Sequence, residues 1–364
     1  MSKATNSMET VSQALRLAVV GCGAVTEMLH IPGLRGALSV KPVLFVDTDL
    51  SRAQVCAAQF GARASSDLWA GPDEFDAVLV CTSPHSHYEI CRRALEAGKH
   101  VLCEKPFVLS SSEGRHLHAM AKSKGLVLSV CHVRRLFWNS QLIKQMLRAG
   151  FLRGVRSIVM EDGRPYGWPQ KSGDIFKPDK AAGVFLANGI HCLDLLYWWC
   201  DGQIEVVEHL SDASGGAEAN TITKLRCTAG AEQFEAILRF STTRQLSNRI
   251  VIEAATGEFV VPILPEPRLL EVTVSGLPAG ELFTGAQPLK SEWRNPKSPD
   301  QNACHAIQLE SFAKACRGEA AYYLPTEDVV HEIELGEKCA GSAKPIPAPW
   351  ADVPPALARV AASL

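Results

Sequence analysis

The sequence predicts an α/β protein in which an N-terminal doubly wound parallel sheet is followed by an α+β domain with an open, mainly antiparallel sheet. Three observations predict this fold class. Short apolar runs without polar alternation fill the first third and suit strands buried on both faces. A glycine-rich turn directly follows the first run. Later strand-like runs are separated by turn dipeptides at hairpin spacing.

The parallel sheet is expected within residues 15–133, after a polar tail of residues 1–14. Amphipathic segments separate its strands, and two of them open with the Ser-x-x-Glu pattern of a helix capping box, Ser86 to Glu89 and Ser110 to Glu113. Strands that alternate with helices favour parallel order. The five predicted strands are Leu15 to Gly21, Val40 to Asp47, Asp76 to Ser83, His100 to Pro106 and Leu126 to His132.

A second domain is expected over residues 134–364, because 364 residues exceed what one hydrophobic core usually fills. The pattern predicts a helix from Trp138 to Ala149, and turns at Ala229-Gly230 and Thr256-Gly257 separate strand-like runs. Whether the C-terminal helices, at about residues 303–342, pack back on the first domain is left open. The predicted strands are Val155 to Glu161, Ile204 to Leu210, Ile222 to Cys227, Phe234 to Phe240 and Arg249 to Glu253.

Charge and apolar content exclude several classes of partner. Lys plus Arg number 37 and Asp plus Glu 39, so no excess positive charge attracts nucleic acid or anionic lipid. The first fourteen residues lack the apolar stretch of a signal peptide, and no apolar run reaches membrane-spanning length. We therefore expect a cytoplasmic protein. None of the 12 cysteines forms a Cys-x-x-Cys pair, which favours buried free thiols over disulfides or zinc.

The glycine-rich turn, GCGAVT, lies between a strand and a helix, where a dinucleotide fingerprint occurs. Gly21 permits a tight turn, and Gly23 lets backbone N–H groups approach a pyrophosphate. Asp47 ends the second strand, where a carboxylate accepts hydrogen bonds from ribose hydroxyls. With Asp49 nearby, a 2'-phosphate would be repelled, which favours NAD over NADP. Arg52 leaves NADP open as the alternative.

These motifs together resemble the family of glucose-fructose oxidoreductase, inositol dehydrogenase and MocA-like sugar dehydrogenases, over nearly the whole chain. The resemblance implies that the turn, including Ala24 and Val25, binds NAD, and that Glu104 and Lys105 hold its ribose and nicotinamide. It also implies a cis Lys105–Pro106 peptide. Thr82, Ser83, Pro84 and His87 would line the cofactor, and the second domain would bind substrate and form a homodimer or homotetramer. The resemblance rests on the segments GCGAVT, Asp47, TSPHSH (82–87), AGKHVLCEKP (97–106), VRRL (133–136) and GVFLANGIHCLDLLYWW (183–199).

At the substrate end the sequence departs from the family pattern. The family signature places Gly189, His191 and Asp194 in register but puts Ala187 where a catalytic aspartate is expected. His191 would be the general base, and Asp194, three residues on, could fix its tautomer. Either Lys105 and His191 suffice for catalysis, which we favour, or Asn188 turns inward to orient substrate.

The substrate wall is expected to include Arg135, by its match to a family arginine, and the loop residue Trp168, whose ring suits packing against a sugar. No catalytic metal is expected, because the histidines at positions 85, 87, 116 and 118 lack a third ligand at recognisable spacing. The resemblance implies an NAD(P)-dependent oxidoreductase that transfers hydride between nicotinamide and a carbon of a sugar, polyol or sugar derivative. A non-catalytic NAD(P)-binding sensor and a reductase of a non-sugar dihydrodiol- or tetrapyrrole-type substrate are the alternatives.

Overall fold

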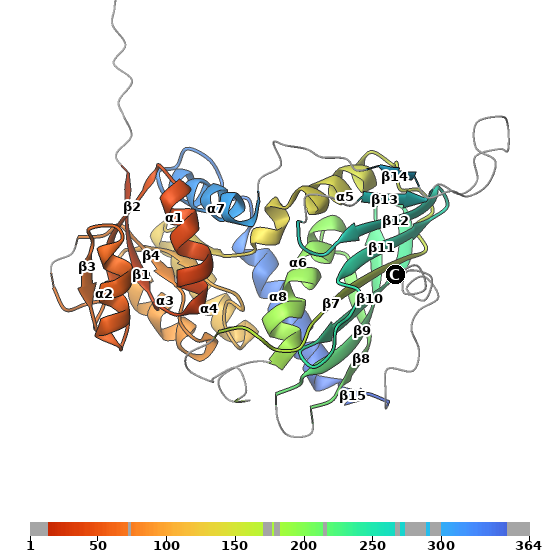
Figure 1. The fold of residues 1–364 in the computed structure, drawn as a ribbon, viewed down its shortest axis with the longest axis horizontal. Coiled ribbons are helices and arrows are strands. Elements are labelled where there is room, and N and C mark those ends of the chain that lie inside the picture. Colours follow the sequence, from red (N-terminus) through yellow and green to blue (C-terminus); the bar gives the residue numbers. More distant parts are fainter. Residues whose placement is uncertain are drawn as a thin grey trace, which may run out of the picture.

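A computed structural model describes residues 14–71, 74–169, 177, 183–213, 217–265, 270–273, 289–291 and 300–347. The predicted polar tail lies outside these residues except for Ala14. Two sheets face each other across a layer of helices, with the smaller parallel sheet on one side and the large sheet on the other (Figure 1). No helix among the described residues is long and apolar enough to cross a membrane.

The first sheet is parallel throughout, with strand order β3-β2-β1-β4-β5-β6, as the sequence predicts for a doubly wound fold. Strand order reverses between β1 and β4, and the carboxyl ends of these two strands form the crevice in which such sheets bind ligands. The strands are β1 (Leu15–Val20), β2 (Val40–Val46), β3 (Arg63–Ser65), β4 (Ala77–Val80), β5 (His100–Cys103) and β6 (Leu128–Val130).

Burial on both faces explains the apolar runs. In β4, Val78 and Val80 belong to one hydrophobic core, whereas Ala77 and Leu79 belong to the core on the opposite face. Residues that alternate along a strand point to opposite faces, so every position must be apolar. The helices that cover this sheet are α1 (Ile31–Gly36), α2 (Leu50–Ala58), α3 (His87–Glu96) and α4 (Ser111–Lys124), with a π-helical turn, η1 (Thr26–His30), before α1.

Only one of the two predicted capping boxes is present. The Ser110 hydroxyl accepts a hydrogen bond from the Glu113 N–H at 3.3 Å and caps α4. The Ser86 box is wrong, because this residue makes no side-chain cap on α3. Its hydroxyl instead donates to Oγ1 of Thr82 at 2.7 Å, and a short 3-10 turn, η2 (Pro84–Ser86), leads into the helix.

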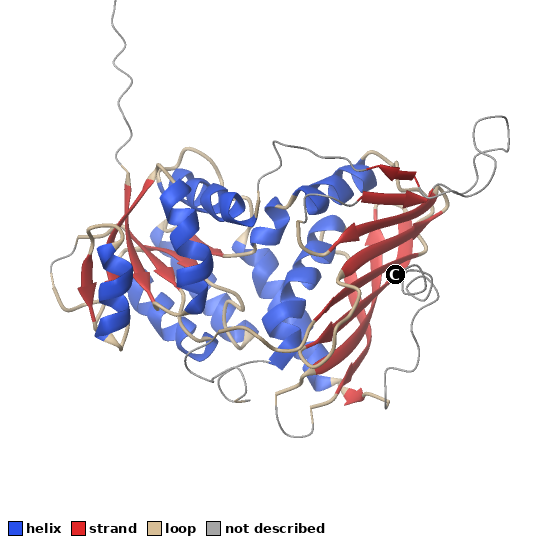
Figure 2. Ribbon diagram, viewed as in Figure 1, coloured by secondary structure: helices blue, strands red, loops and turns tan. Residues whose placement is uncertain are grey.

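The second sheet has nine strands in the order β14-β13-β12-β11-β7-β10-β9-β8-β15, and helices cover one of its faces (Figure 2). It is mainly antiparallel, as predicted, but the β7/β10 and β15/β8 pairs are parallel, so the sheet is mixed. Its longer strands are β7 (Ser157–Gly163), β8 (Ile204–Ser211), β9 (Asn220–Ala229), β10 (Glu232–Ser241), β11 (Arg249–Ala254) and β12 (Gly257–Pro262). The shorter ones are β13 (Leu270–Thr273), β14 (Leu289–Ser291) and β15 (Lys344–Pro345).

The helices against this sheet are α5 (Trp138–Arg148) and α6 (Ile190–Trp199), the latter preceded by a π-helical turn, η5 (Phe185–Gly189). Two C-terminal helices, α7 (Gln301–Cys316) and α8 (Thr326–Gly341), return to the first domain (Figure 1). Glu310 of α7 accepts a hydrogen bond from the Ser39 N–H at 2.7 Å, and Glu337 of α8 accepts one from the Ser111 N–H at 2.8 Å. Both helices therefore seal the first domain.

All 12 cysteines lie among the described residues and are free thiols, as predicted. Eleven of them are buried, and Cys316 is half-buried. Burial raises the pKa of the Cys131 thiol well above its usual range, which keeps it protonated and unreactive.

Candidate active site

The glycine-rich turn sits at the strand-order reversal. Gly21 has φ +96°, and a Cβ there would lie 2.6 Å from the Cys81 carbonyl oxygen, so only glycine fits. Thr26 occupies the position of a third glycine, is fully buried, and donates its hydroxyl to the Gly21 carbonyl at 2.6 Å. The imperfect fingerprint is thus compensated by a hydrogen bond that holds the turn to the following helix.

Around Gly23 the structure leaves room for a ligand. A Cβ added there would meet no atom within 4 Å. Beside it, Asp47 accepts the Cys22 N–H at 2.8 Å with one carboxylate oxygen and the Asp49 N–H at 2.9 Å with the other. The carboxylate is therefore fixed next to the turn, half-buried at the end of β2, where a ribose would lie.

A cavity of about 370 Å³ opens at this edge. Its two aspartates, Asp47 and Asp67, make one part acidic, while Trp69 and Ile90 make another part apolar. The cavity is lined by Val20, Gly21, Val46, Asp47, Thr48, Ser66, Asp67, Leu68, Trp69, Thr82, Ser86, Glu89, Ile90 and Arg93. These residues fit the adenosine half of a dinucleotide: apolar surface for a flat base and carboxylates for ribose hydroxyls.

The predicted loop residues Thr82, Ser83 and Pro84 are half-buried at the end of β4, and Thr82 lines the cavity. His87 differs, because its side chain is fully buried. Its Nε2 lies 2.9 Å from the Thr82 carbonyl oxygen, and its Nδ1 lies 3.0 Å from the carbonyl oxygens of Pro106 and Phe107. The ring thus supports two loops from behind rather than lining the pocket.

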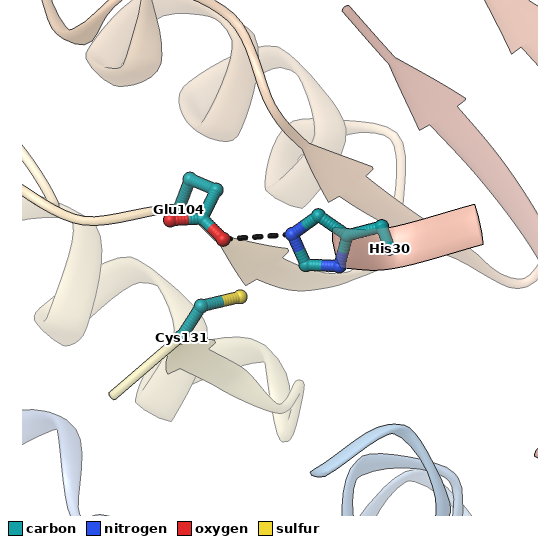
Figure 3. A group of neighbouring side chains, drawn as sticks. All are labelled: His30, Glu104 and Cys131. Carbon is teal, nitrogen blue, oxygen red and sulfur yellow. Dashed lines mark hydrogen bonds and ion pairs between the residues drawn. The ribbon is translucent and has the colours of Figure 1, made fainter. Parts of the chain in front are cut away.

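Glu104 and His30 form a buried pair under the turn, beside the Cys131 thiol (Figure 3). One oxygen of the carboxylate lies 2.7 Å from His30 Nε2, and the other accepts the Lys105 N–H at 3.0 Å. Burial alone would raise the pKa of Glu104, but the hydrogen bond and charge of His30 lower it to about 2. Glu104 therefore anchors the Lys105 backbone, and the Lys105–Pro106 peptide is cis, as the family resemblance implies.

This pair makes a testable contribution to stability against pH. Burial lowers the pKa of His30, but Cys81 and Glu104 outweigh it and raise the pKa to about 10 from an ordinary 6.5. The stabilisation from His30 is complete below pH 6.5 and is lost as pH rises through 10. The stabilisation from Glu104 is complete above pH 4.5 and is lost as pH falls through 2. The pair thus contributes fully between pH 4.5 and 6.5.

Urea unfolding of the wild type and of His30→Gln across pH 5–10 measures this effect. We expect the difference in unfolding free energy between the two proteins to shrink steadily as pH rises from 6.5 towards 10. His116→Gln, a change in an exposed histidine of α4, is the control and should leave the pH slope of the wild type in place. A constant difference at every pH would contradict the charged pair.

Lys105 reaches across to the second domain. Its Nζ donates to the Ala187 carbonyl oxygen at 2.6 Å, at the position where the family pattern predicts an aspartate. Burial lowers the pKa of Lys105, and the Glu104 carboxylate opposes this shift. The ammonium group is therefore held between β5 and η5, one helical turn before His191.

His191 lies at the start of α6 and is 8% exposed. Burial, followed by the positive charges of Lys105 and Arg134, holds its pKa well below 6.5. The imidazole is consequently neutral at physiological pH and can accept a proton. The π-helical turn η5 directly before it carries Ala187 and the half-buried Asn188, so the backbone is irregular at the site of the missing carboxylate.

Two predicted substrate contacts are wrong. Arg135 is 2% exposed and pairs with Asp194, donating from Nε at 2.8 Å and approaching it with Nη2 at 2.7 Å. Asp194, fully buried, therefore pairs with this arginine and makes no hydrogen bond to His191. The predicted tautomer-fixing contact fails because a guanidinium fork satisfies a carboxylate better than one imidazole N–H does. Trp168, 40% exposed after β7, stays a prediction for the substrate wall.

Beside this ion pair lie residues that the sequence analysis missed. His132 follows β6, with its Nε2 3.1 Å from a Glu332 oxygen of α8 and its Nδ1 3.8 Å from Asp194. The His132 and His191 rings meet edge to face, with centroids 5.7 Å apart. His132 carried a signal, since it ends a predicted strand at the same sheet edge as Lys105. Nothing in the sequence indicated Glu332, because the pattern of a helix does not reveal which residues pack against its buried face.

Two groups among the described residues have ligand types suited to a metal ion: His30, Glu104 and Cys131, and His132, Asp194 and Glu332. The ion pair of His30 with Glu104 already satisfies the first group. In the second group, the Arg135 guanidinium lies 2.7 Å from Asp194 and 3.8 Å from Glu332, and its positive charge opposes a cation.

The fold and site together define a two-domain protein built to bind a dinucleotide at the reversal point of a parallel sheet. Residues 15–132 match a family model described as an oxidoreductase family with an NAD-binding Rossmann fold, and residues 140–260 match the GFO/IDH/MocA C-terminal domain. The chain belongs to the Gfo/Idh/MocA family, as its motifs indicated.

Curated relatives and solved structures agree with this membership. A D-glucoside 3-dehydrogenase of Escherichia coli is 29% identical over 189 residues, which are 50% of this chain and 53% of that protein, so the match spans about half of the relative. The crystal structure of KijD10, a 3-ketoreductase from Actinomadura kijaniata with NADP and TDP-benzene, has TM-score 0.77 at 21% identity and covers 92% of this chain and 99% of that one. GenD2 from gentamicin A biosynthesis, bound to NAD, has TM-score 0.73 at 20% identity, covering 91% and 94%.

Proposed function

We propose that the protein is an NAD-dependent oxidoreductase that transfers hydride between the nicotinamide and a hydroxyl- or keto-bearing carbon of a sugar, polyol or sugar derivative. The observation that carries the proposal is the 2.6 Å hydrogen bond from Lys105 to Ala187, which brings a lysine of the dinucleotide domain beside the neutral His191 of the second domain. In alcohol oxidation a neutral imidazole can act as the general base, and a cation can stabilise the negative charge that develops on the oxygen.

Each residue has a role that follows from its state. NAD, when bound, accepts or supplies the hydride. The open space at Gly23 and the cavity beside Asp47 fit its pyrophosphate and ribose. His191 takes the hydroxyl proton on oxidation and returns it on reduction. The Lys105 ammonium stabilises the negative charge that develops on the substrate oxygen.

The choice of NAD over NADP rests on charge at the ribose end. Asp47 and Asp67 line the cavity, and both carboxylates would repel a 2'-phosphate. Of the nearby cations, Arg52 lies 3.2 Å from Asp49 and is thereby engaged, and the Arg93 guanidinium lies over the Trp69 ring, 5.4 Å from its centroid. NADP is bound in the KijD10 structure and NAD in that of GenD2, so relatives of this fold take either cofactor.

Replacing Asp47 with Asn tests this cofactor choice. We expect affinity for NAD to fall about tenfold or more, because the ribose hydroxyls lose a charged acceptor worth about 1.5–3 kcal/mol. Affinity for NADP should rise, since repulsion of the 2'-phosphate is relieved. Quenching of protein fluorescence by each cofactor measures both. Asp300→Asn, at the exposed N-cap of α7, is the control, and an unchanged ratio of the two affinities in Asp47→Asn would contradict the assignment.

The substrate class is tested by nicotinamide absorbance. Wild-type protein with saturating NAD is assayed on a panel of sugars, glucosides, inositols, sugar acids and nucleotide-linked sugars, and NADH is assayed with the matching ketones. If the wild type turns over one class of substrate in the panel and Lys105→Met does not, the proposal is supported. NAD binding with a silent panel would favour a sensor that has lost catalysis, an alternative that the missing carboxylate at Ala187 favours. Ala187→Asp on the same panel then separates lost activity from an untried substrate.

Assembly of copies through the second domain is part of the proposal. Among the described residues, helices cover only one face of the nine-stranded sheet (Figure 2). The opposite face of the sheet is left without a covering helix by the described part of the chain in the same view (Figure 2). We propose a homodimer or homotetramer that covers this face, which light scattering of the full chain would measure directly.

A further inference from the structure

Behind His191 lies a buried group of ionisable side chains that the hydride-transfer scheme above does not use. His132, Asp194 and Glu332 are each fully buried, and they come from the end of β6, from α6 and from α8. One donor or acceptor atom of each lies within 4.8 Å of the other two. Arg135 binds Asp194 on one side and lies 3.1 Å from Asp328 on the other.

Several buried polar atoms of this group lack hydrogen-bond partners, and burying such atoms without partners costs free energy. Both nitrogens of His132, one oxygen of Asp194 and both oxygens of Glu332 are buried without a hydrogen-bond partner. The 3.1 Å approach of His132 to Glu332 is within ion-pair distance but is not aligned as a hydrogen bond. Nδ1 of His191 is likewise buried without a partner, and the His191 and His132 rings lie edge to face with centroids 5.7 Å apart.

The charges of these side chains determine where a proton can reside in the group. With Arg135 positive and both aspartates negative, a proton bound to the group can reside either on Glu332 or on His132. Moving it between these two groups, 3.1 Å apart, leaves the net charge of the group unchanged. Burial and the adjacent Asp194 raise the pKa of Glu332 well above 4.5, which favours the proton on the carboxyl. Burial also lowers the pKa of His132, which agrees with that placement.

We propose that Glu332 and His132 store and relay the proton that His191 exchanges with substrate, in place of the carboxylate missing at position 187. The inference rests on the proposed function. In the reducing direction the keto carbon gains hydride from reduced nicotinamide, and its oxygen gains the proton of His191. His191 recovers a proton from His132, and His132 recovers one from the carboxyl of Glu332. Oxidation runs each transfer backwards: Glu332 first releases its proton to solvent past Asp328, and its carboxylate then takes the proton that His191 received from substrate.

The way out to solvent leads past Asp328. Its carboxylate lies one helical turn before Glu332 on α8 and is 26% exposed, so it is the part of the group that water reaches. The charged and titratable groups that bear on the relay are Lys105, Glu104, Arg134 and His305 from neighbouring elements, together with Asp194, Arg135 and Asp328 within it. Glu332 and His132 touch neither cofactor nor substrate in this scheme and are positioning and relay residues.

Glu332→Gln and His132→Gln test the relay, with Glu334→Gln as the matched control on the same helix, where the side chain is 30% exposed. The substrate that the panel identifies is used with the full chain. In both relay variants we expect kcat to fall about tenfold to a hundredfold, because general acid–base steps contribute about 10²–10⁴. NAD affinity should hold, and the solvent deuterium isotope effect on kcat should rise as proton transfer becomes rate-limiting. Glu332→Asp should recover part of kcat.

A second arm needs no substrate, so failure of the relay is distinguishable from failure of the proposed function. Infrared difference spectra on raising the pH should show a protonated buried carboxyl in the wild type that is absent from Glu332→Gln, and ¹⁵N NMR should show the titration of His132 shifted in that variant. A folded Glu332→Gln protein with unchanged kcat and isotope effect would overturn the relay. So would an infrared band that persists in that variant.

Discussion

Replacing Lys105 with Met is expected to reduce turnover by about 10²–10³-fold while leaving NAD affinity nearly unchanged. The ammonium group bonds to the η5 turn through the Ala187 carbonyl oxygen at 2.6 Å. Methionine fills similar space but cannot stabilise negative charge on a substrate oxygen, and loss of one such donor has effects of this size. Steady-state kinetics on the identified substrate, with cofactor affinity from fluorescence, measure the two quantities separately.

Lys122→Met is the matched control for this experiment. Lys122 is exposed in the last turn of α4, so the same substitution there should leave both turnover and NAD affinity as in the wild type. If Lys105→Met bound NAD and turned over substrate within about twofold of the wild type, the ammonium would have no catalytic role. A loss of NAD affinity that matched the loss of turnover would instead place Lys105 in cofactor binding alone.

Replacing Arg135 with Met is expected to lower the free energy of unfolding by about 3–5 kcal/mol, because it leaves buried carboxylates without their cation. Arg135 is 2% exposed and lies within 4 Å of Asp194, Asp328 and Glu332. Burial opposes its charge, but these carboxylates raise the pKa of Arg135 above its usual range, so the guanidinium is charged at every working pH. Urea unfolding at pH 7 measures the loss.

The control for this change is Arg115→Met. Arg115 also reaches α8 and pairs with Glu334 there, but the arginine side chain is 56% exposed. An exposed pair is screened by water and contributes little. Equal losses for the two substitutions would mean that the buried group is not held together by Arg135. A double change, Arg135→Met with Asp194→Asn, should recover part of the loss, because the unpaired carboxylate is removed as well.

The first domain was predictable because its strands are buried on both faces. Runs such as Leu15 to Gly21 are apolar at every position, and the structure places all five predicted strands in one parallel sheet. The missed strand, β3, has only three residues, all half-buried, so no apolar run marks it. Asp67 and Trp69, which follow β3 and line the cavity beside Asp47, were missed together with it.

The substrate end was less predictable because it depends on which charged groups meet across domains. The family resemblance pointed to Lys105 and His191, and the structure bonds Lys105 to the carbonyl of Ala187, four residues before His191. The resemblance placed Arg135 in the substrate wall because nothing local reveals that Asp194 and two carboxylates of α8 surround it. Such pairings follow from the tertiary arrangement, and no periodicity along the chain encodes them.

The helix α8 contributes to two cores at once, with Val329 and Ile333 in the first domain and Leu335 and Cys339 in the second. During synthesis the parallel sheet emerges first, but its apolar surface stays open until this late helix has left the ribosome. We therefore expect the nascent sheet to remain only partly packed for most of translation. Once the helix docks, neither half can unfold without exposing part of the other, so the two domains are expected to melt in a single transition.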